Sequence, residues 1–236
     1  MSTPSTRPAP LSDCRVVVTG GLGALGRAVG QLLAERGARV VLLDRAPQQD
    51  VPGMTAVLGG VDLGDEAATI AAMAEAGRLL GGLNALVNVA GGFRWETVEG
   101  GSLASWDALY GMNLRSAVAA SRAALPLLRA ATPAAIVNVG ALAAHKAGNG
   151  MGAYAASKAG VARLTEALAE ELKDAGVRVN AVLPSILDTP ANRADMPDAD
   201  ATRWVSGPQL AAVIAFLLSA DAAAVTGACI PVAGRV

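Results

Sequence analysis

The chain has few residues of the kinds on which several common functions depend. Among its 236 residues two are cysteine and one is histidine, and aromatic residues make up 3%. The two cysteines, Cys14 and Cys229, lie beside apolar, strand-like runs, where buried free thiols are usual. We expect free thiols and a cytoplasmic location, with a single disulfide as the alternative. The scarcity of histidine and cysteine also predicts no metal site.

Charge and long apolar runs are scarce too. Charged residues make up 17%, and 19 basic residues nearly balance 20 acidic ones, for a net charge of −1. Phosphate backbones demand a basic excess, so we expect no nucleic-acid partner. The apolar stretch 210–220 is shorter than the roughly 20 residues that span a bilayer, and residues 1–12 lack the apolar core of a signal peptide. We therefore expect no membrane partner.

What the chain does have is apolar residues, at 53%, in a repeating order. Short β-branched runs alternate with alanine- and leucine-rich segments of helical period, as in βαβ units around a parallel sheet. Strands are predicted near 15–19, 38–43, 55–61, 84–88, 134–139, 177–183 and 228–232. Helices are predicted near 24–36, 65–80, 103–130, 151–174 and 207–219, with Pro126 expected to bend or end the third.

This order predicts an α/β fold, a doubly wound Rossmann-type, seven-stranded and mostly parallel sheet with helices on both faces. Residues 1–12 are expected to form a disordered tail, and residues 13–236 a single dinucleotide-binding catalytic domain. The segment 185–205 follows a strand's carboxyl end and contains Pro190 and Pro197. Ligands bind at that edge of such sheets, so we expect a substrate lid there.

A glycine-rich turn follows the first predicted strand. Gly21, Gly23 and Gly26 have G-x-G-x-x-G spacing just before a helix, a pattern that brings backbone amides to a pyrophosphate. Asp44 closes the next strand, where a carboxylate binds the adenosine ribose and repels a 2′-phosphate. This favours NAD over NADP, although the neighbouring Arg45 offers a phosphate partner instead.

Tyr154 and Lys158 are four residues apart near the start of a predicted helix, so their side chains share one face. A phenol with a pKa near about 10 transfers protons poorly at neutral pH, and a neighbouring cation favours its ionised form. The pair therefore indicates proton transfer; the plainer alternative is an ordinary pair on a helix surface.

With these residues, the chain resembles the short-chain dehydrogenase/reductase family over nearly its whole length. The matching segments are T-G-G-L-G-A-L-G at 19–26, Asp44, Asp62 with Leu63, N-V-A-G at 88–91, M-N-L at 112–114, Y-A-A-S-K at 154–158 and V-T-G at 225–227. The resemblance implies an oxidoreductase with catalytic Tyr154 and Lys158, and with Asn113 anchoring a water. It implies that NAD is bound by Gly20, Gly21, Gly23, Leu25, Gly26, Asp44, Asp62, Leu63, Asn88, Ala90, Gly91, Tyr154, Lys158, Pro184, Ile186 and Thr189. Plainer alternatives are that Asn113 caps or bends its helix and that Asn88 satisfies backbone groups.

The sequence departs from the family pattern at three positions. Ala24 and Ser185 replace frequent glycines, and Ala141 stands where the family usually places a serine that holds the substrate carbonyl. Loss of such a hydroxyl typically costs about a hundred- to a thousandfold in rate. His145 in the same loop is a candidate substitute, or simply a solvated histidine.

Three functions fit this pattern. The segment from Ala181 onward resembles dihydropteridine reductases, which implies NADH-dependent reduction of a pterin-like or quinonoid compound that needs no carbonyl clamp. The alternatives are a carbonyl reductase or alcohol dehydrogenase acting on oxoacyl or cyclic ketone substrates, and an NAD(H)-binding sensor with little turnover. The family resemblance also implies a homodimer or homotetramer that pairs through the helices predicted at 103–130 and 151–174.

Overall fold

The central sheet carries the fold in the computed structural model, which describes residues 11–236. Its strands are β1 (Arg15–Thr19), β2 (Arg39–Leu43), β3 (Ala56–Leu58), β4 (Ala85–Asn88), β5 (Ala134–Val139), β6 (Val177–Pro184) and β9 (Cys229–Val232). They lie in the order β3-β2-β1-β4-β5-β6-β9, and every neighbouring pair is parallel. The predicted seven-stranded, Rossmann-like α/β fold is confirmed, with a sheet parallel throughout.

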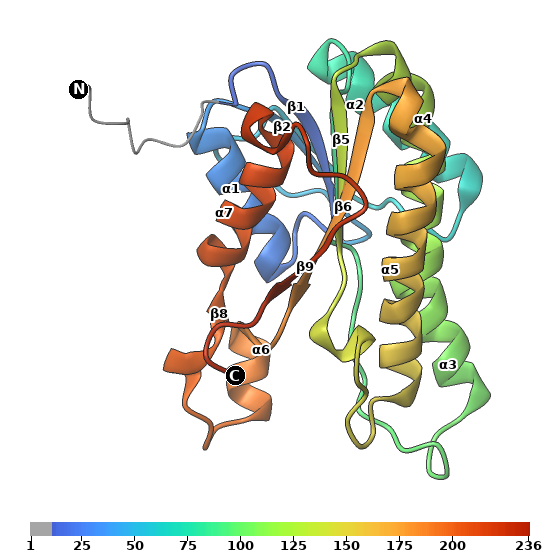
Figure 1. Ribbon diagram of the computed structural model, residues 1–236, viewed down its shortest axis with the longest axis vertical. Coiled ribbons are helices and arrows are strands. Elements are labelled where there is room, and N and C mark those ends of the chain that lie inside the picture. Colours follow the sequence, from blue (N-terminus) through green and yellow to red (C-terminus); the bar gives the residue numbers. More distant parts are fainter. Residues whose placement is uncertain (1–10) are drawn as a thin grey trace.

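Helices cover both faces of this sheet. Figure 1 shows α1 (Ala24–Glu35) and α7 (Gly207–Leu218) on one side, and α4 (Ser116–Ala130) and α5 (Gly152–Leu172) on the other. The helix α2 (Glu66–Leu80) packs in the same apolar cluster as α4 and α5. Within β1, Val16 and Val18 pack towards α1 and α7, whereas Val17 packs towards α2, α4 and α5. The alternation follows from the two-residue period of a strand.

The helix predicted at 103–130 is divided. It consists of α3 (Leu103–Tyr110), a π-helical turn at Gly111–Arg115 and then α4. Pro126 was expected to bend or end the helix; it lies inside α4, which continues to Ala130, so it does not end the helix. Ala124 and Leu128 are buried on either side of the proline, and this packing offsets the roughly 3 kcal/mol that an internal proline costs.

The packed part of the chain begins before residue 13. Leu11 is buried, and its amide donates to the carbonyl of Arg36 at 2.8 Å. Residues 11 and 12, which the sequence analysis assigned to a tail, therefore belong to the folded part, while the rest of that predicted tail, 1–10, lies outside the described residues. Among the helices of residues 11–236, none is both long and apolar enough to cross a membrane.

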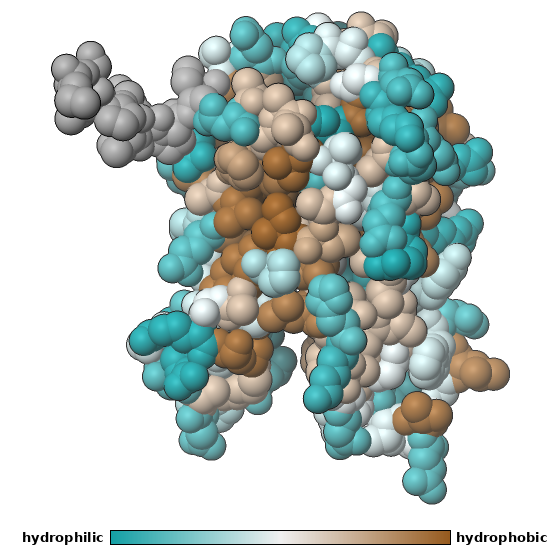
Figure 2. Space-filling model, viewed as in Figure 1, coloured by the Kyte–Doolittle hydropathy of each residue, from teal (hydrophilic) through white to brown (hydrophobic). Residues whose placement is uncertain are grey.

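Two short strands organise the segment that follows β6. β7 (Leu187–Asp188) pairs in parallel with β8 (Val205–Ser206), and α6 (Pro190–Asp195) lies between them along the chain. No helix or strand was predicted for this segment from the sequence. Figure 2 shows an open notch between the two lower lobes of the molecule. Figure 1 identifies one lobe as α6 and β8 and the other as α3 with the start of α5.

Candidate active site

The glycine-rich turn after β1 brings β1 and β4 together at their carboxyl ends. Gly20 has a φ of +63°, a left-handed conformation that suits glycine, and a β-carbon there would lie 2.8 Å from the Ala90 backbone. The hydroxyl of Thr19 accepts hydrogen bonds from the amides of Val89 and Ala90, each at 3.2 Å. A β-carbon on Gly26 would collide with the carbonyl oxygen of Gly20. The turn is thus packed closely against the 88–91 segment at the start of α1.

Asp44 holds the glycine-rich turn from the side of β2. Its Oδ2 accepts from the amide of Leu22 at 2.8 Å, and its Oδ1 accepts from the amide of Ala46 at 2.8 Å. The neighbouring Arg45 is exposed. The carboxylate therefore lies beside the turn, as the sequence spacing predicted, and keeps further lone pairs for a ligand.

Asp62 and Leu63 lie after β3, on the same side of the molecule. Asp62 is exposed and its Oδ1 accepts from the amide of Gly64 at 2.8 Å. The side chain of Leu63 is buried in the cluster beneath α2, so its packing in the core accounts for the apolar side chain at this position.

Tyr154 and Lys158 share a face of α5, as the spacing predicted. The ammonium nitrogen of Lys158 lies 6.0 Å from the centre of the Tyr154 ring and donates to the carbonyl oxygen of Val139 at 2.9 Å. Lys158 is only 5% exposed. Burial lowers the pKa of the Lys158 ammonium to about 8 and raises the pKa of the Tyr154 phenol to about 12.

Asn113 joins this group from the π-helical turn. Its Oδ1 accepts from the amide of Gly92 at 2.9 Å, and its Nδ2 donates to the Gly92 carbonyl at 3.1 Å and to Ser157 Oγ at 2.9 Å. Gly91 separates Asn113 from Lys158, because a β-carbon on Gly91 would lie 2.6 Å from Asn113 Oδ1 and 3.3 Å from Lys158 Nζ. Two predicted catalytic residues thus meet at a third predicted site residue, Gly91.

Asn88 lies deeper than the rest of its segment. Its Nδ2 donates to Asn138 Oδ1 at 2.9 Å and to Ser121 Oγ at 3.1 Å, which ties β4 to β5 and α4. At 4% exposure its side chain serves the interior. Ala90 and Gly91 are more accessible, so these two present the segment to the notch.

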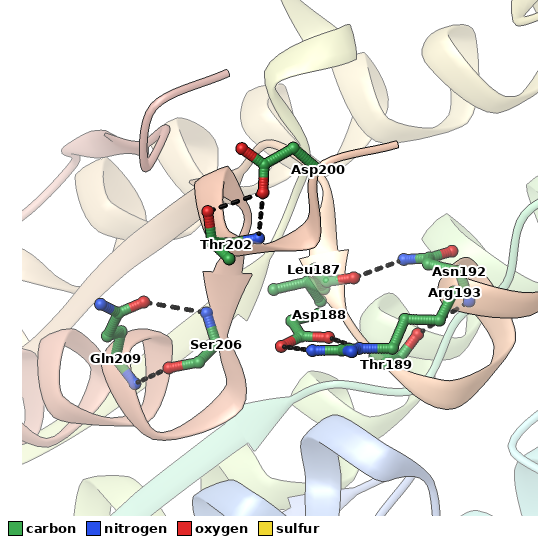
Figure 3. Close-up of polar contacts among 9 residues, drawn as sticks. All are labelled: Leu187, Asp188, Thr189, Asn192, Arg193, Asp200, Thr202, Ser206 and Gln209. Carbon is green, nitrogen blue, oxygen red and sulfur yellow. Dashed lines mark hydrogen bonds and ion pairs between the residues drawn. The ribbon is translucent and has the colours of Figure 1, made fainter. Parts of the chain in front are cut away.

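The segment from 187 to 209 is held by its own polar contacts, shown in Figure 3. Thr189 caps α6 by accepting from the amide of Asn192 at 3.2 Å, and Arg193 binds Asp188 with two hydrogen bonds. Pro184 ends β6 and Ile186 is partly buried just beyond it. This segment faces the glycine-rich turn across a small cavity lined by Ala24, Leu25, Leu187, Asp188, Thr189 and Gly207.

Ala141 leaves the usual serine position without a hydroxyl. It is buried in extended backbone at the end of β5, just before a single turn of 3₁₀ helix at Leu142–Ala144. His145 follows that turn and is exposed, and its amide donates to the carbonyl of Leu142 at 3.0 Å.

Phe93 is a site residue that the sequence analysis missed. Its ring meets the Tyr154 ring edge to face, with centroids 5.0 Å apart and planes at 89°. The available signal was an aromatic residue directly after Gly91 and Gly92 in a chain with two phenylalanines.

The arrangement suits a nicotinamide dinucleotide. Added β-carbons would strike backbone at Gly20 and Gly26 in the turn, and side-chain atoms at Gly91. An ammonium is buried at one end of the site, and a carboxylate lies at the other. Backbone amides at a helix start bind phosphates, and a carboxylate binds ribose hydroxyls. No cluster of histidine, cysteine, aspartate or glutamate suited to a metal ion lies within residues 11–236.

Comparisons with known proteins agree with this fold. The chain is 34% identical over 234 residues to cis-4-hydroxycyclohexanecarboxylate dehydrogenase of Sinomonas cyclohexanicum, covering 92% of this chain and 94% of that protein. It is 31% identical to 2-(S)-hydroxypropyl-CoM dehydrogenase 3 of Xanthobacter autotrophicus, over 93% of this chain and 94% of the relative.

A solved structure also superposes closely. An NADPH-bound short chain oxidoreductase from Pseudomonas aeruginosa PAO1, described as containing an atypical catalytic center, has a TM-score of 0.86 and 29% identity, over 97% of this chain and 98% of the other. The family model for short chain dehydrogenases matches residues 15–200. The chain therefore belongs to the short chain dehydrogenase family of nicotinamide-dependent oxidoreductases.

Proposed function

We propose that this chain is an NAD(H)-dependent oxidoreductase that uses a Tyr154–Lys158 proton relay, with residues 13–236 acting as one catalytic domain. The observation that carries the proposal is the buried Lys158 ammonium, 6.0 Å from the centre of the Tyr154 ring. A cation that near favours the ionised phenol once a proton has left.

In the reductive direction, the Tyr154 hydroxyl donates its proton to the substrate oxygen, and in the oxidative direction it accepts that proton. The nicotinamide, when bound, supplies or takes up the hydride at the substrate carbon. The high pKa of the buried Tyr154 keeps it protonated and able to donate at neutral pH. Lys158 balances the charge that then develops on the phenol, and it binds the nicotinamide ribose. Asn113 anchors a water that reprotonates the relay.

The proposed dinucleotide site extends from the glycine-rich turn to the lid. It comprises Gly20, Gly21, Gly23, Leu25, Gly26, Asp44, Asp62, Leu63, Asn88, Ala90, Gly91, Tyr154, Lys158, Pro184, Ile186 and Thr189. Asp44 favours NAD, because its carboxylate beside the turn repels a 2′-phosphate. Titration with NADH and NADPH tests this preference, and tighter binding of NADPH, the cofactor of the Pseudomonas structure, would overturn it.

For the substrate we propose a cyclic ketone or the corresponding alcohol. The Sinomonas relative is named for a hydroxycyclohexane substrate and matches nearly the whole chain. A quinonoid pterin is the second candidate, favoured by Ala141, because a conjugated C=N group does not require a serine to hold a carbonyl.

The test of the relay is Tyr154→Phe, with Tyr110→Phe as the matched control because Tyr110 is the other tyrosine and is exposed on α3. We expect Tyr154→Phe to lower kcat with cyclic ketones by about 100-fold or more, since proton transfer contributes on the order of 10²–10⁴. The Kd for NADH changes far less, because Tyr154 is one of many residues in the proposed dinucleotide site. Equal rates in the two variants would contradict the proposed relay.

We also propose a homodimer or homotetramer. Val98, Leu103 and Trp106 place apolar side chains at the surface around α3, and two of them approach Gly152 at the start of α5. This is the region of the helices through which the family resemblance implies pairing.

A further inference from the structure

An exposed aromatic side chain, Phe93, lies beside the proposed proton donor. Phe93 contacts the Tyr154 ring edge to face, yet 53% of its own surface is exposed. A phenylalanine that only covered its neighbour would bury most of its ring. The exposed part is therefore available to a molecule that approaches the Tyr154 hydroxyl.

The position of Phe93 is fixed by the packing of its neighbours. The ring of Trp95 lies directly on the α-carbon of Gly150, where a β-carbon would not fit, and the Glu96 amide donates to the Gly150 carbonyl at 2.8 Å. Met112 packs on Gly92 in the same way. The segment that carries Phe93 is thus held at both ends, so its ring meets a substrate with little loss of entropy.

Charged side chains of the same segment point elsewhere. Arg94 donates to Ser105 Oγ at 3.0 Å, and Glu96 Oε2 accepts from Ser105 Oγ at 2.9 Å, so both charges are directed to the start of α3. Phe93 and Trp95 alternate with them, as expected of extended chain. The side chains that this segment places on the side of Phe93 are therefore aromatic, although charged residues alternate with them in the sequence.

We infer that Phe93 selects substrates in which the reacting carbon belongs to, or is attached to, a ring that packs on the exposed face of the Phe93 side chain, and that flat rings gain most from this contact. This inference rests on the proposed function and names the substrate class of that site. Aromatic ring pairs contribute about 0.5–1.5 kcal/mol beyond the area they bury, which is up to about tenfold in kcat/KM. A flexible alkyl chain gains less from the same contact, because it must be ordered against the ring.

The experiment compares acetophenone with a linear methyl ketone of the same carbon number, using NADH-loaded enzyme. The variants are Phe93→Ala and Phe93→Leu. The matched control is Phe216→Ala, since Phe216 is the other phenylalanine and lies on α7 across the sheet with 42% exposure. We expect wild type and Phe216→Ala to favour acetophenone, Phe93→Ala to lose about tenfold in kcat/KM for acetophenone relative to the linear ketone, and Phe93→Leu to lose part of it.

Equal losses for the two ketones in Phe93→Ala would overturn the inference, because Phe93 would then merely support Tyr154. Equilibrium binding of both ketones to protein loaded with NAD⁺, which has no hydride to transfer to them, is measured by calorimetry and separates this inference from the proposed function. If wild type binds acetophenone more tightly through Phe93 but reduces neither these two ketones nor a cyclic ketone, the specificity inference holds and the proposed reaction fails. No binding preference in wild type overturns the inference whatever the rates.

Discussion

Lys158 is a buried lysine whose ammonium donates to one backbone oxygen, that of Val139. Burial penalises its charged form and lowers its pKa to about 8, and yet its proposed role needs the charge. Below pH 8 the buried lysine therefore carries the charge that its proposed role needs, and this charge lowers the free energy of unfolding. Such opposition between stability and function is common where a charge is kept inside a protein.

This opposition predicts a pH-dependent stability. The folded pKa of Lys158, about 8, lies below the ordinary lysine value of 10.5, so the unfolded chain binds more protons between these values. The free energy of unfolding must then rise with pH across that window and fall as pH drops towards 8. Relative to Lys158→Met, we expect wild type to gain about 2 kcal/mol from pH 8 to pH 10. Urea unfolding at each pH measures it; parallel curves for the two proteins would show that Lys158 is not buried as a cation.

Gly91 fits at its position because it has no side chain. A β-carbon there would lie 2.6 Å from Asn113 Oδ1 and close to Lys158 Nζ, both of which belong to the proposed relay. We expect Gly91→Ala to lower kcat at least tenfold by displacing these groups, because small misplacements of reacting groups are costly. Gly111→Ala is the matched control, since a β-carbon at Gly111 meets open space. A fully active Gly91→Ala variant would mean that the Asn113 and Lys158 positions do not matter to the rate.

At the scale of elements, the strands were predictable and the π-helical turn was not. The strands of the central sheet are short, mostly apolar runs whose side chains alternate between two packed faces, a signal that the sequence carries directly. The turn at Gly111–Arg115 adds one residue to a helical period that α3 and α4 otherwise continue, and no residue type announces it. Asn113 was found from the family resemblance, but its hydrogen bonds to Gly92 depend on that turn.

Contacts between distant segments were also beyond sequence reasoning. The Phe93–Tyr154 contact joins residues far apart in the chain, and no periodic pattern reports such a pair. The lid role of residues 185–205, predicted from its prolines and its place after β6, stays a prediction. The β7–β8 pairing was not predicted, since strands of two residues carry no periodicity.

Thr189 and Ser206 perform the same structural task in two neighbouring elements, which allows a matched test of the lid. Thr189 accepts from the amide of Asn192 at the start of α6, and Ser206 accepts from the amide of Gln209 at the start of α7 (Figure 3). Replacing either by alanine removes a cap and lowers stability by about 1 kcal/mol. Only Thr189 lies in the proposed dinucleotide site.

We therefore expect Thr189→Ala to raise the Kd for NADH several-fold, and Ser206→Ala to leave it within twofold, at similar losses of stability. Fluorescence titration with NADH gives the affinities and thermal unfolding gives the stabilities. If both variants bind NADH equally well, Thr189 serves α6 alone and does not contact the cofactor.

At the scale of the whole molecule, the described surface has apolar area that the fold itself does not cover. Leu103 is 83% exposed, and Val98 and Trp106 lie near it, on the lobe opposite α6 (Figure 1). Clustered apolar side chains of this size on a surface mark interaction sites more often than isolated ones do. The lobe that contains α3 also forms one wall of the notch. A molecule that covers the patch would therefore affect how a substrate enters the notch.

If a second copy of the chain covers this patch, a change in the patch must alter the oligomeric state. We expect wild type to sediment as a dimer or tetramer at micromolar concentration, and Leu103→Glu to shift it towards monomer, because a carboxylate cannot be buried there without a partner. Ile70→Glu is the matched control, since Ile70 is 52% exposed but lies on α2. Analytical ultracentrifugation distinguishes the three proteins. A monomeric wild type contradicts the proposed assembly. An Ile70→Glu variant that dissociates as Leu103→Glu does would show that the interface is not specific to α3. Because the patch adjoins the start of α5, which forms part of one wall of the notch, we expect dissociation to make that wall less rigid and so to raise KM.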